Sequence, residues 1–221
     1  MFGLFKKKKL SRKEQSEKLL EKKGIKINYN LPHIESEEET TVRTPNEIAE
    51  RAIVLAILNF VAFNSLTGEE ASKYLNKYNL YQFVTPDEHD FLQNPTEEKK
   101  NKESWKCEGI WTLLWALKIV DDLGDPDEMC NLNDVPADKY PINQDRDPNL
   151  FIRNNLQSRT KSEILDANDL YYRMNWACVD ARINGREVEY LNTGVVYERQ
   201  YALNWLINYM DQDWDDISCD T

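Results

Sequence analysis

Apolar side chains recur three or four positions apart along most of residues 44–210, which is the spacing of one face of a helix. The densest such stretch is residues 160–182, where large aromatic side chains stand beside charged ones. Thr160 and Glu163 have the spacing of a capping box, which predicts a helix start, and Asn184 with Gly185 suits its end. We predict a central helix here, with an apolar stripe toward the core that contains Leu165, Tyr172, Trp176, Val179 and Ile183.

Similar start signals divide the rest of the chain. Thr44 precedes Pro45 and stands three residues before Glu47, and the pairs at Thr67 and Thr85 repeat this spacing. Together with apolar periodicity, these signals predict helices over residues 44–65, 67–78, 85–92, 105–120, 147–156 and 195–210. The Lys- and Glu-rich residues 96–103 favour a solvated turn or loop, and residues 121–147 favour a long loop with one turn of helix.

Two segments have the alternation of short strands, residues 24–32 and residues 186–192. The acidic run that follows the first of them, residues 35–39, is typical of a linker. We therefore predict a mainly α fold: a single compact multi-helix domain over residues 44–221 with at most a small strand pair. A basic N-terminal extension precedes it, with a leader and linker over residues 1–43 that are partly extended.

The charge of the chain is unevenly distributed. The formal net charge is −11, yet residues 1–26 carry ten Lys or Arg against three Glu, so residues 27–221 carry a net −18. An acidic body repels nucleic-acid phosphates, which argues against DNA or RNA as a partner. A basic protein is the partner that this charge favours.

The cysteines and histidines show no metal-site spacing. Cys107, Cys130, Cys178 and Cys219 form no C-x-x-C pair, and both histidines lie far from them in sequence. We expect no metal and no cofactor. Without a secretory segment or an apolar run long enough to span a bilayer, the chain is expected to be cytoplasmic, with reduced thiols.

The first nine residues suggest weak contact with an anionic membrane. Three large apolar side chains precede four lysines, and such a segment can rest on a lipid surface while the lysines meet the headgroups. The candidate contact residues are Phe2, Leu4, Phe5, Lys6, Lys7, Lys8 and Lys9. The alternatives are a solvated tail and a segment that docks on the acidic body itself. The membrane reading would place the protein at the inner face of the membrane.

Charged residues beside aromatic ones mark a candidate polar site. Ions on such helices are expected to be paired, because an unpaired buried ion costs several kcal/mol to desolvate. If the three aromatic-rich helices pack together, their charges meet at one seam, with carboxylates and arginines in reach of each other. The candidates are Glu108, Asp166, Asp169, Arg173, Asp180, Arg182, Glu198 and Arg199. No motif assigns a catalytic residue, so we favour buried ion pairs that fix helix register over a catalytic site, with a ligand or anion pocket as the third reading.

Four motifs carry a family resemblance. They read EILDANDLYYRMNWACVDAR, VVYERQYALNWL, WKCEGIWTLLWAL (residues 105–117) and WDD (residues 214–216). The chain resembles a bacterial domain-of-unknown-function family, the one numbered four thousand two hundred and seventy-two, over residues 31–221. The resemblance leaves the basic leader uncovered. It implies a bacterial, largely helical, cytoplasmic protein and brings no catalytic residues with it.

Two function classes remain open from the sequence. The first is a non-catalytic interaction or regulatory protein whose acidic body binds a basic partner, with an immunity or antitoxin role as one form of it. The second is a hydrolase-like enzyme that uses the carboxylate and arginine seam. They differ in one observable: the enzyme requires a solvent-open cleft at that seam, whereas a binding protein tolerates closed ion pairs there.

Overall fold

The computed structural model describes residues 10–143 and 146–221, and its regular secondary structure there is entirely helical. The first part of the chain contains α1 (Arg12–Lys22), α2 (Pro45–Ala62), α3 (Gly68–Lys77), η1 (Tyr81–Phe83), α4 (Pro86–Gln93), α5 (Glu97–Ser104) and α6 (Cys107–Ala116). The second part contains η2 (Leu132–Asp134), α7 (Asn149–Asn154), α8 (Lys161–Ile183), α9 (Thr193–Leu206), η3 (Tyr209–Asp211) and η4 (Trp214–Asp216). The mainly α prediction is confirmed.

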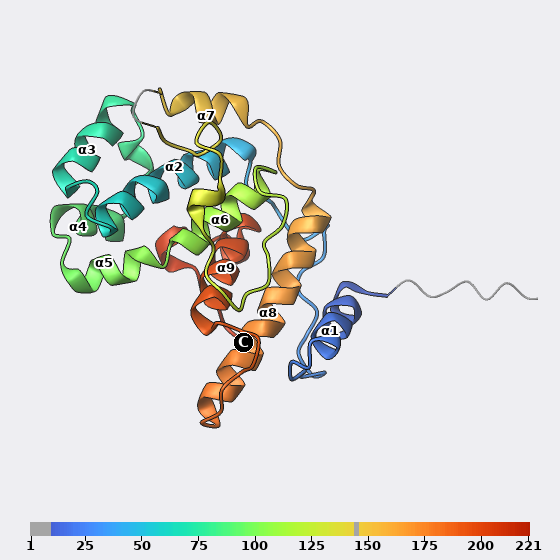
Figure 1. The fold of residues 1–221 in the computed structure, drawn as a ribbon. Coiled ribbons are helices and arrows are strands. Elements are labelled where there is room, and N and C mark those ends of the chain that lie inside the picture. Colours follow the sequence, from blue (N-terminus) through green and yellow to red (C-terminus); the bar gives the residue numbers. More distant parts are fainter. Residues whose placement is uncertain (1–9, 144–145) are drawn as a thin grey trace, which may run out of the picture.

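Two groups of helices share one core. Helix α2 packs against α3, α4, α5, α6 and α7, whereas α8 packs against α1 and α9. Helix α6 contacts both α2 and α9, so it joins the two groups. In Figure 1, α3, α4 and α5 gather at one end of the molecule while α1 lies alongside α8 at the other. Most side chains of α2 are buried, as its apolar composition predicts.

The helix starts follow the predicted caps closely. Thr44, Thr67, Thr85 and Thr160 each accept a hydrogen bond from the amide three residues later, and the glutamate there bonds back to complete a capping box. Residues 96–103, expected to be a solvated turn or loop, instead form α5, which Thr96 caps. The two expected strands are absent from the described residues. Within the predicted loop, residues 121–143 and 146–147 are described, and their only regular element is the short helical turn η2.

The predicted apolar stripe of α8 is wrong in part. Leu165 is buried, but Tyr172, Trp176 and Val179 are only half-buried, and Ile183 is 75% exposed. The helix is covered from two sides, by α1 and by α9, so it buries a different and more polar set. That set includes Ile164, Asn168, Asp169, Tyr171, Arg173, Met174 and Asn175.

The described part of the basic N-terminal segment, residues 10–26, docks on the acidic body. Leu20 is fully buried and Ile25 nearly so, although this segment was expected to lie outside the core. Arg12 Nε lies 2.7 Å from Asp166 Oδ1 and Lys26 Nζ lies 2.8 Å from Asp180 Oδ2. The division at residue 43 stays a prediction, but α1 packs on the domain rather than apart from it.

Residues Phe2, Leu4, Phe5, Lys6, Lys7, Lys8 and Lys9 lie outside the described residues, so the membrane contact stays a prediction. Among the described residues, no helix has the length and apolar character needed to cross a bilayer.

Two glycines in helices differ in the space around them, and this predicts opposite effects of alanine. A Cβ on Gly68 would lie 1.9 Å from the backbone oxygen of Leu92, so Gly68→Ala is expected to cost about 1–3 kcal/mol of unfolding free energy. A Cβ on Gly109 meets its nearest neighbour, Trp214, at 3.6 Å. Gly109→Ala should therefore be neutral or stabilising, because alanine favours a helix interior by about 0.5–1 kcal/mol. Urea denaturation of both variants measures this, and equal effects would contradict it.

Candidate functional site

The charged residues singled out from the sequence do not meet at one seam. Glu108 and Arg199 form one closed pair between α6 and α9, with 2.7 Å between Arg199 Nε and Glu108 Oε2. Arg199 also donates to the Tyr171 hydroxyl and to the Gly124 carbonyl. Glu108 has no exposed surface and Arg199 is 2% exposed. This pair is closed to solvent.

Asp169 and Arg173 form a second buried pair, one turn apart on α8. Arg173 Nε and Nη2 donate to the two carboxylate oxygens at 2.9 and 2.7 Å, and Nη2 also donates to the Pro32 carbonyl. Glu17 of α1 lies 3.9 Å from Arg173 Nη1. The pair thus holds both α1 and the segment before α2 against the central helix α8.

The remaining candidates divide between a third buried pair and the surface. Glu198 lies 3.1 Å from Lys106 Nζ, with both side chains nearly buried. Asp166 pairs with Arg12 at the surface, and Asp180 pairs with Lys26 and Arg186. Arg182 is exposed. The structure therefore places seven of the eight residues in separate ion pairs and leaves Arg182 outside them. The eight residues share no common seam, although Arg182 and Glu198 line one hollow together.

Sequence reasoning missed an ionic layer around Trp214. Arg51 Nη2 donates to both oxygens of Glu88 at 2.8 and 2.7 Å, and the Arg51 guanidinium lies 5.3 Å from the centre of the Trp214 ring. Lys106 Nζ lies 6.0 Å from the same ring and 4.3 Å from that of Tyr201. Arg51 directly precedes the apolar run of residues 52–58 in α2, and a cation at that position is the signal that could have found it.

Glu103 lies in this ionic layer, and its titration predicts a pH dependence. Burial, opposed by Lys106, raises the pKa of Glu103 to about 7. The folded state therefore binds more protons than the unfolded state between about pH 4.5 and 7, so the stability from Glu103 falls as the pH rises. Glu103→Gln should raise the free energy of unfolding by about 1–3 kcal/mol at pH 8 and change it little at pH 4.

The measurement is urea denaturation at both pH values, with Glu98→Gln as the control. Glu98 lies on the same helix with an exposed side chain. Its replacement should therefore leave the pH dependence of the unfolding free energy unchanged. A Glu103 variant with the same pH profile as the original chain would contradict the assignment.

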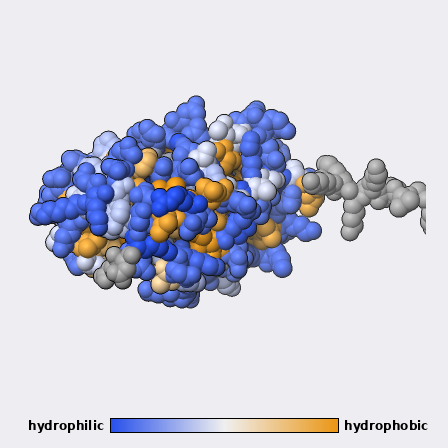
Figure 2. Space-filling model, turned by 90° about the horizontal axis from the view of Figure 1, so that it is seen from above, coloured by the Kyte–Doolittle hydropathy of each residue, from blue (hydrophilic) through white to orange (hydrophobic). Residues whose placement is uncertain are grey.

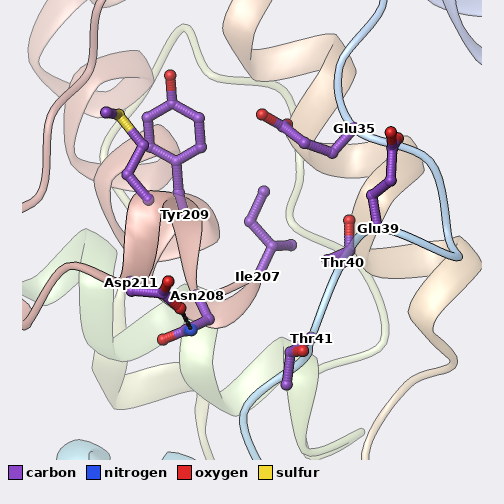
Figure 3. A pocket seen from close by; sticks show the side chains of 9 residues that line it. Glu35, Glu39, Thr40, Thr41, Ile207, Asn208, Tyr209 and Asp211 are labelled. Atoms are coloured by element: carbon purple, nitrogen blue, oxygen red, sulfur yellow. Dashed lines mark hydrogen bonds between the residues drawn. The ribbon is translucent and has the colours of Figure 1, made fainter.

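A hollow with an acidic wall lies where the linker before α2 meets the end of α9. It has a volume of about 160 Å³. Its lining consists of Glu35, Glu39, Thr40, Thr41 and residues 207–211. Figure 3 shows Glu35 and Glu39 on one side, Tyr209 and Asp211 on the other, and Ile207 between them. Glu35, Glu39 and Asp211 are exposed, and no Lys, Arg or His belongs to this lining.

A second hollow adjoins the first, because Glu35 and Tyr209 line both. It has a volume of about 260 Å³ and extends over α8 and α9 to Asp220. Gln200, which lines it, is 1% exposed, and its side-chain oxygen Oε1 is buried without a hydrogen-bond partner. A buried acceptor without a donor is costly, so this hollow suits a ligand that brings hydrogen-bond donors.

We call the two adjoining hollows with Glu35, Glu39, Asp211 and Asp220 the acidic face. Burial raises the pKa of Tyr209, and the negative charges of Glu35 and Asp220 raise it further. Burial likewise raises the pKa of Tyr172, to which Glu35 also contributes, while Arg173 opposes the shift. Both phenols thus remain protonated donors beside a negative surface. This field attracts cations and disfavours anions.

The turn that forms one wall of the acidic face has unusual backbone geometry. Asn208, Met210 and Asp211 have φ of 52°, 53° and 54°, a left-handed region that non-glycine residues rarely adopt. Met210 is 69% exposed, and Asn208 Nδ2 donates to Asp211 Oδ1 at 2.6 Å. Such geometry concentrates at binding and active sites. The turn therefore exposes the apolar Met210 side chain to solvent next to the Asp211 carboxylate.

A larger hollow of about 860 Å³ lies elsewhere, between α8, α9 and residues 186–194. Its lining mixes Arg182 and Arg186 with Glu187, Glu198 and apolar side chains. None of the buried partnerless side-chain atoms in the described residues belongs to it, so it has no polar group that demands a ligand.

The face of the molecule seen from above is mostly hydrophilic (Figure 2). Figure 2 shows hydrophobic side chains gathered across the middle of the face seen from above, within a largely hydrophilic surround.

The family model described as Domain of unknown function (DUF4272) matches residues 12–217. The match begins nearer the N-terminus than residue 31, so it also includes α1, which the resemblance over residues 31–221 had left uncovered. No curated protein and no solved structure matches the chain significantly.

Proposed function

This chain belongs to the DUF4272 family, and from its geometry we propose that it is a non-catalytic interaction protein that binds a basic protein partner through the acidic face. The observation that carries the proposal is the pair of hollows that share Glu35 and Tyr209. Their linings contain four carboxylates and no Lys or Arg, which is the arrangement that receives a lysine or arginine side chain.

The second hollow adds hydrogen-bond chemistry to this charge. A guanidinium presents five N–H donors and an ammonium three, so either can satisfy the buried Oε1 of Gln200 while its charge meets Glu35 or Asp220. Tyr209 and Met210 provide apolar surface for the methylene stem of such a side chain. An inhibitor or immunity role against a basic target is the narrower form of this proposal.

The hydrolase alternative has less support. Glu108, Asp169 and their arginine partners are nearly or fully buried in closed pairs, so a substrate cannot reach them. Arg182 and Glu198 do line a common hollow, but the Glu198 carboxylate is paired there with Lys106. General acid or base work requires a carboxylate within reach of a substrate proton.

The test is binding of a fluorescently labelled arginine-rich peptide to the full chain, measured by fluorescence anisotropy at low and physiological salt. Replacing Glu35→Gln, Glu39→Gln and Asp211→Asn together should weaken binding by roughly threefold to a hundredfold, since exposed pairs contribute about 0.2–1 kcal/mol each. Binding to the unmodified chain should also weaken as salt screens these charges.

The matched control replaces Glu69, Glu97 and Glu98 by Gln, which changes the net charge equally on α3 and α5. That variant should bind nearly as well as the original chain. Gln200→Leu, which leaves the charge unchanged, should weaken binding if the second hollow receives a side chain. Equal losses in the two charge variants would mean that only net charge matters and would overturn the proposal.

A further inference from the structure

Two cysteines far apart in sequence lie together at the start of α6. The ligand atoms of Cys107, Glu108 and Cys130 are all within 4.8 Å of one another. Cys107 and Glu108 open α6, whereas Cys130 comes from the long loop that follows it. The absence of a C-x-x-C pair led us to expect no metal, but the loop brings together thiols that sequence spacing keeps apart.

Hydrogen bonds hold the loop in this position. The Cys130 amide donates to Glu108 Oε1 at 2.6 Å, and the Cys130 thiol lies 3.5 Å from the Cys107 carbonyl oxygen. The other Glu108 oxygen accepts from Arg199. The three groups are therefore preorganised by contacts to the backbone and to α9, as outer contacts orient the ligands of metal sites.

The thiols are accessible from one side. Cys107 and Cys130 line a hollow of about 660 Å³, together with Met129, Asn131 and Tyr140. Cys130 is half-buried, Cys107 is 6% exposed and Glu108 lies fully buried behind them. An ion entering from the hollow thus meets both sulfur atoms before it reaches the carboxylate.

We propose that Cys107, Cys130 and Glu108 form a binding site for a thiophilic divalent ion of the zinc and cadmium type. Two thiolates and one carboxylate are ligands that such ions accept, and the hollow leaves a fourth position open to water. Each thiol releases its proton to solvent as its sulfur binds the ion, so no oxidant or reductant is needed. The two thiolate charges balance the ion, while Arg199 continues to balance Glu108.

Binding should depend on pH, because both protons must leave. Only the thiolate form of a cysteine binds such an ion, so the ion must displace the protons of both thiols. Each ion bound should release two protons, and the affinity should rise with pH.

The experiment is a titration of the reduced full chain with Cd²⁺, followed by thiolate-to-cadmium charge-transfer absorption and by proton release in weak buffer. The expected result is one ion and two protons per site. Cys107→Ser with Cys130→Ser should abolish the signal. The matched control, Cys178→Ser with Cys219→Ser, removes the two thiols that line a different hollow and should retain it.

Circular dichroism checks that the variants fold. If the first double variant does not fold, Cys130→Ala alone serves, since Cys130 is half-buried in a loop. Its affinity should fall by more than the roughly 10–100-fold that loss of an outer contact costs. An unchanged signal without Cys107 and Cys130, or no signal from the fully reduced chain, would overturn the proposal. So would a signal lost only with Cys178 and Cys219.

Discussion

Replacing Glu108 by alanine is expected to lower the free energy of unfolding by about 3–5 kcal/mol. The change leaves the Arg199 guanidinium in the core without its counter-ion and leaves the Cys130 amide without its acceptor. Arg199 is 2% exposed and held from several sides, so it cannot turn toward solvent. Urea denaturation at pH 7 measures the loss, and an effect below 1 kcal/mol would contradict this account.

A double variant separates the pair from its packing. Glu108→Leu with Arg199→Met removes both charges and keeps most of the side-chain volume, so its loss should be smaller than that of Glu108→Ala alone. The loss of unfolding free energy in the double variant is compared with the sum of the losses in Glu108→Leu and Arg199→Met alone. If the two values are equal, the two ions are not energetically coupled.

Leu20→Ala is expected to lower the free energy of unfolding by about 2–5 kcal/mol, in a single cooperative transition. Leu20 of α1 is fully buried in the common core, and α1 packs along α8. Truncation therefore creates a cavity in the domain itself. The measurement is guanidinium denaturation followed by circular dichroism and by tryptophan fluorescence.

The neighbouring Leu19 provides the control. It is 48% exposed on the same helix, so Leu19→Ala should cost much less. If α1 were a separate leader, Leu20→Ala would leave the main transition where it is, and the division at residue 43 would then be correct.

Local signals predicted the helices well because helix starts depend on neighbours in sequence. A threonine and a glutamate three residues apart make the capping box without help from the rest of the fold, and Thr44 and Thr160 are examples. Helix faces depend on what packs against them. The stripe through Tyr172 and Trp176 has regular spacing, yet α1 and α9 cover other sides of α8.

The acidic face could not be predicted as a site. Glu35 and Glu39 belong to a run of acids that is typical of a solvated linker. Their neighbours in the hollow, residues 207–211, come about 170 positions later and carry no motif. Gln200 lies in a helix whose composition only indicates burial. The net negative charge of residues 27–221 indicated a basic partner. Only tertiary contacts, however, bring four of the carboxylates together around two hollows.

Trp214 lies near two cations that precede it by far in the sequence, Arg51 of α2 and Lys106 immediately before α6. Arg43 similarly rests on Trp205 and donates to the Gln212 carbonyl, 169 positions away. During synthesis on the ribosome, α2 therefore emerges long before the rings that cover its charges. The core around α2 is therefore incompletely packed at this stage. We expect cooperative packing only after residues near 214 have left the exit tunnel.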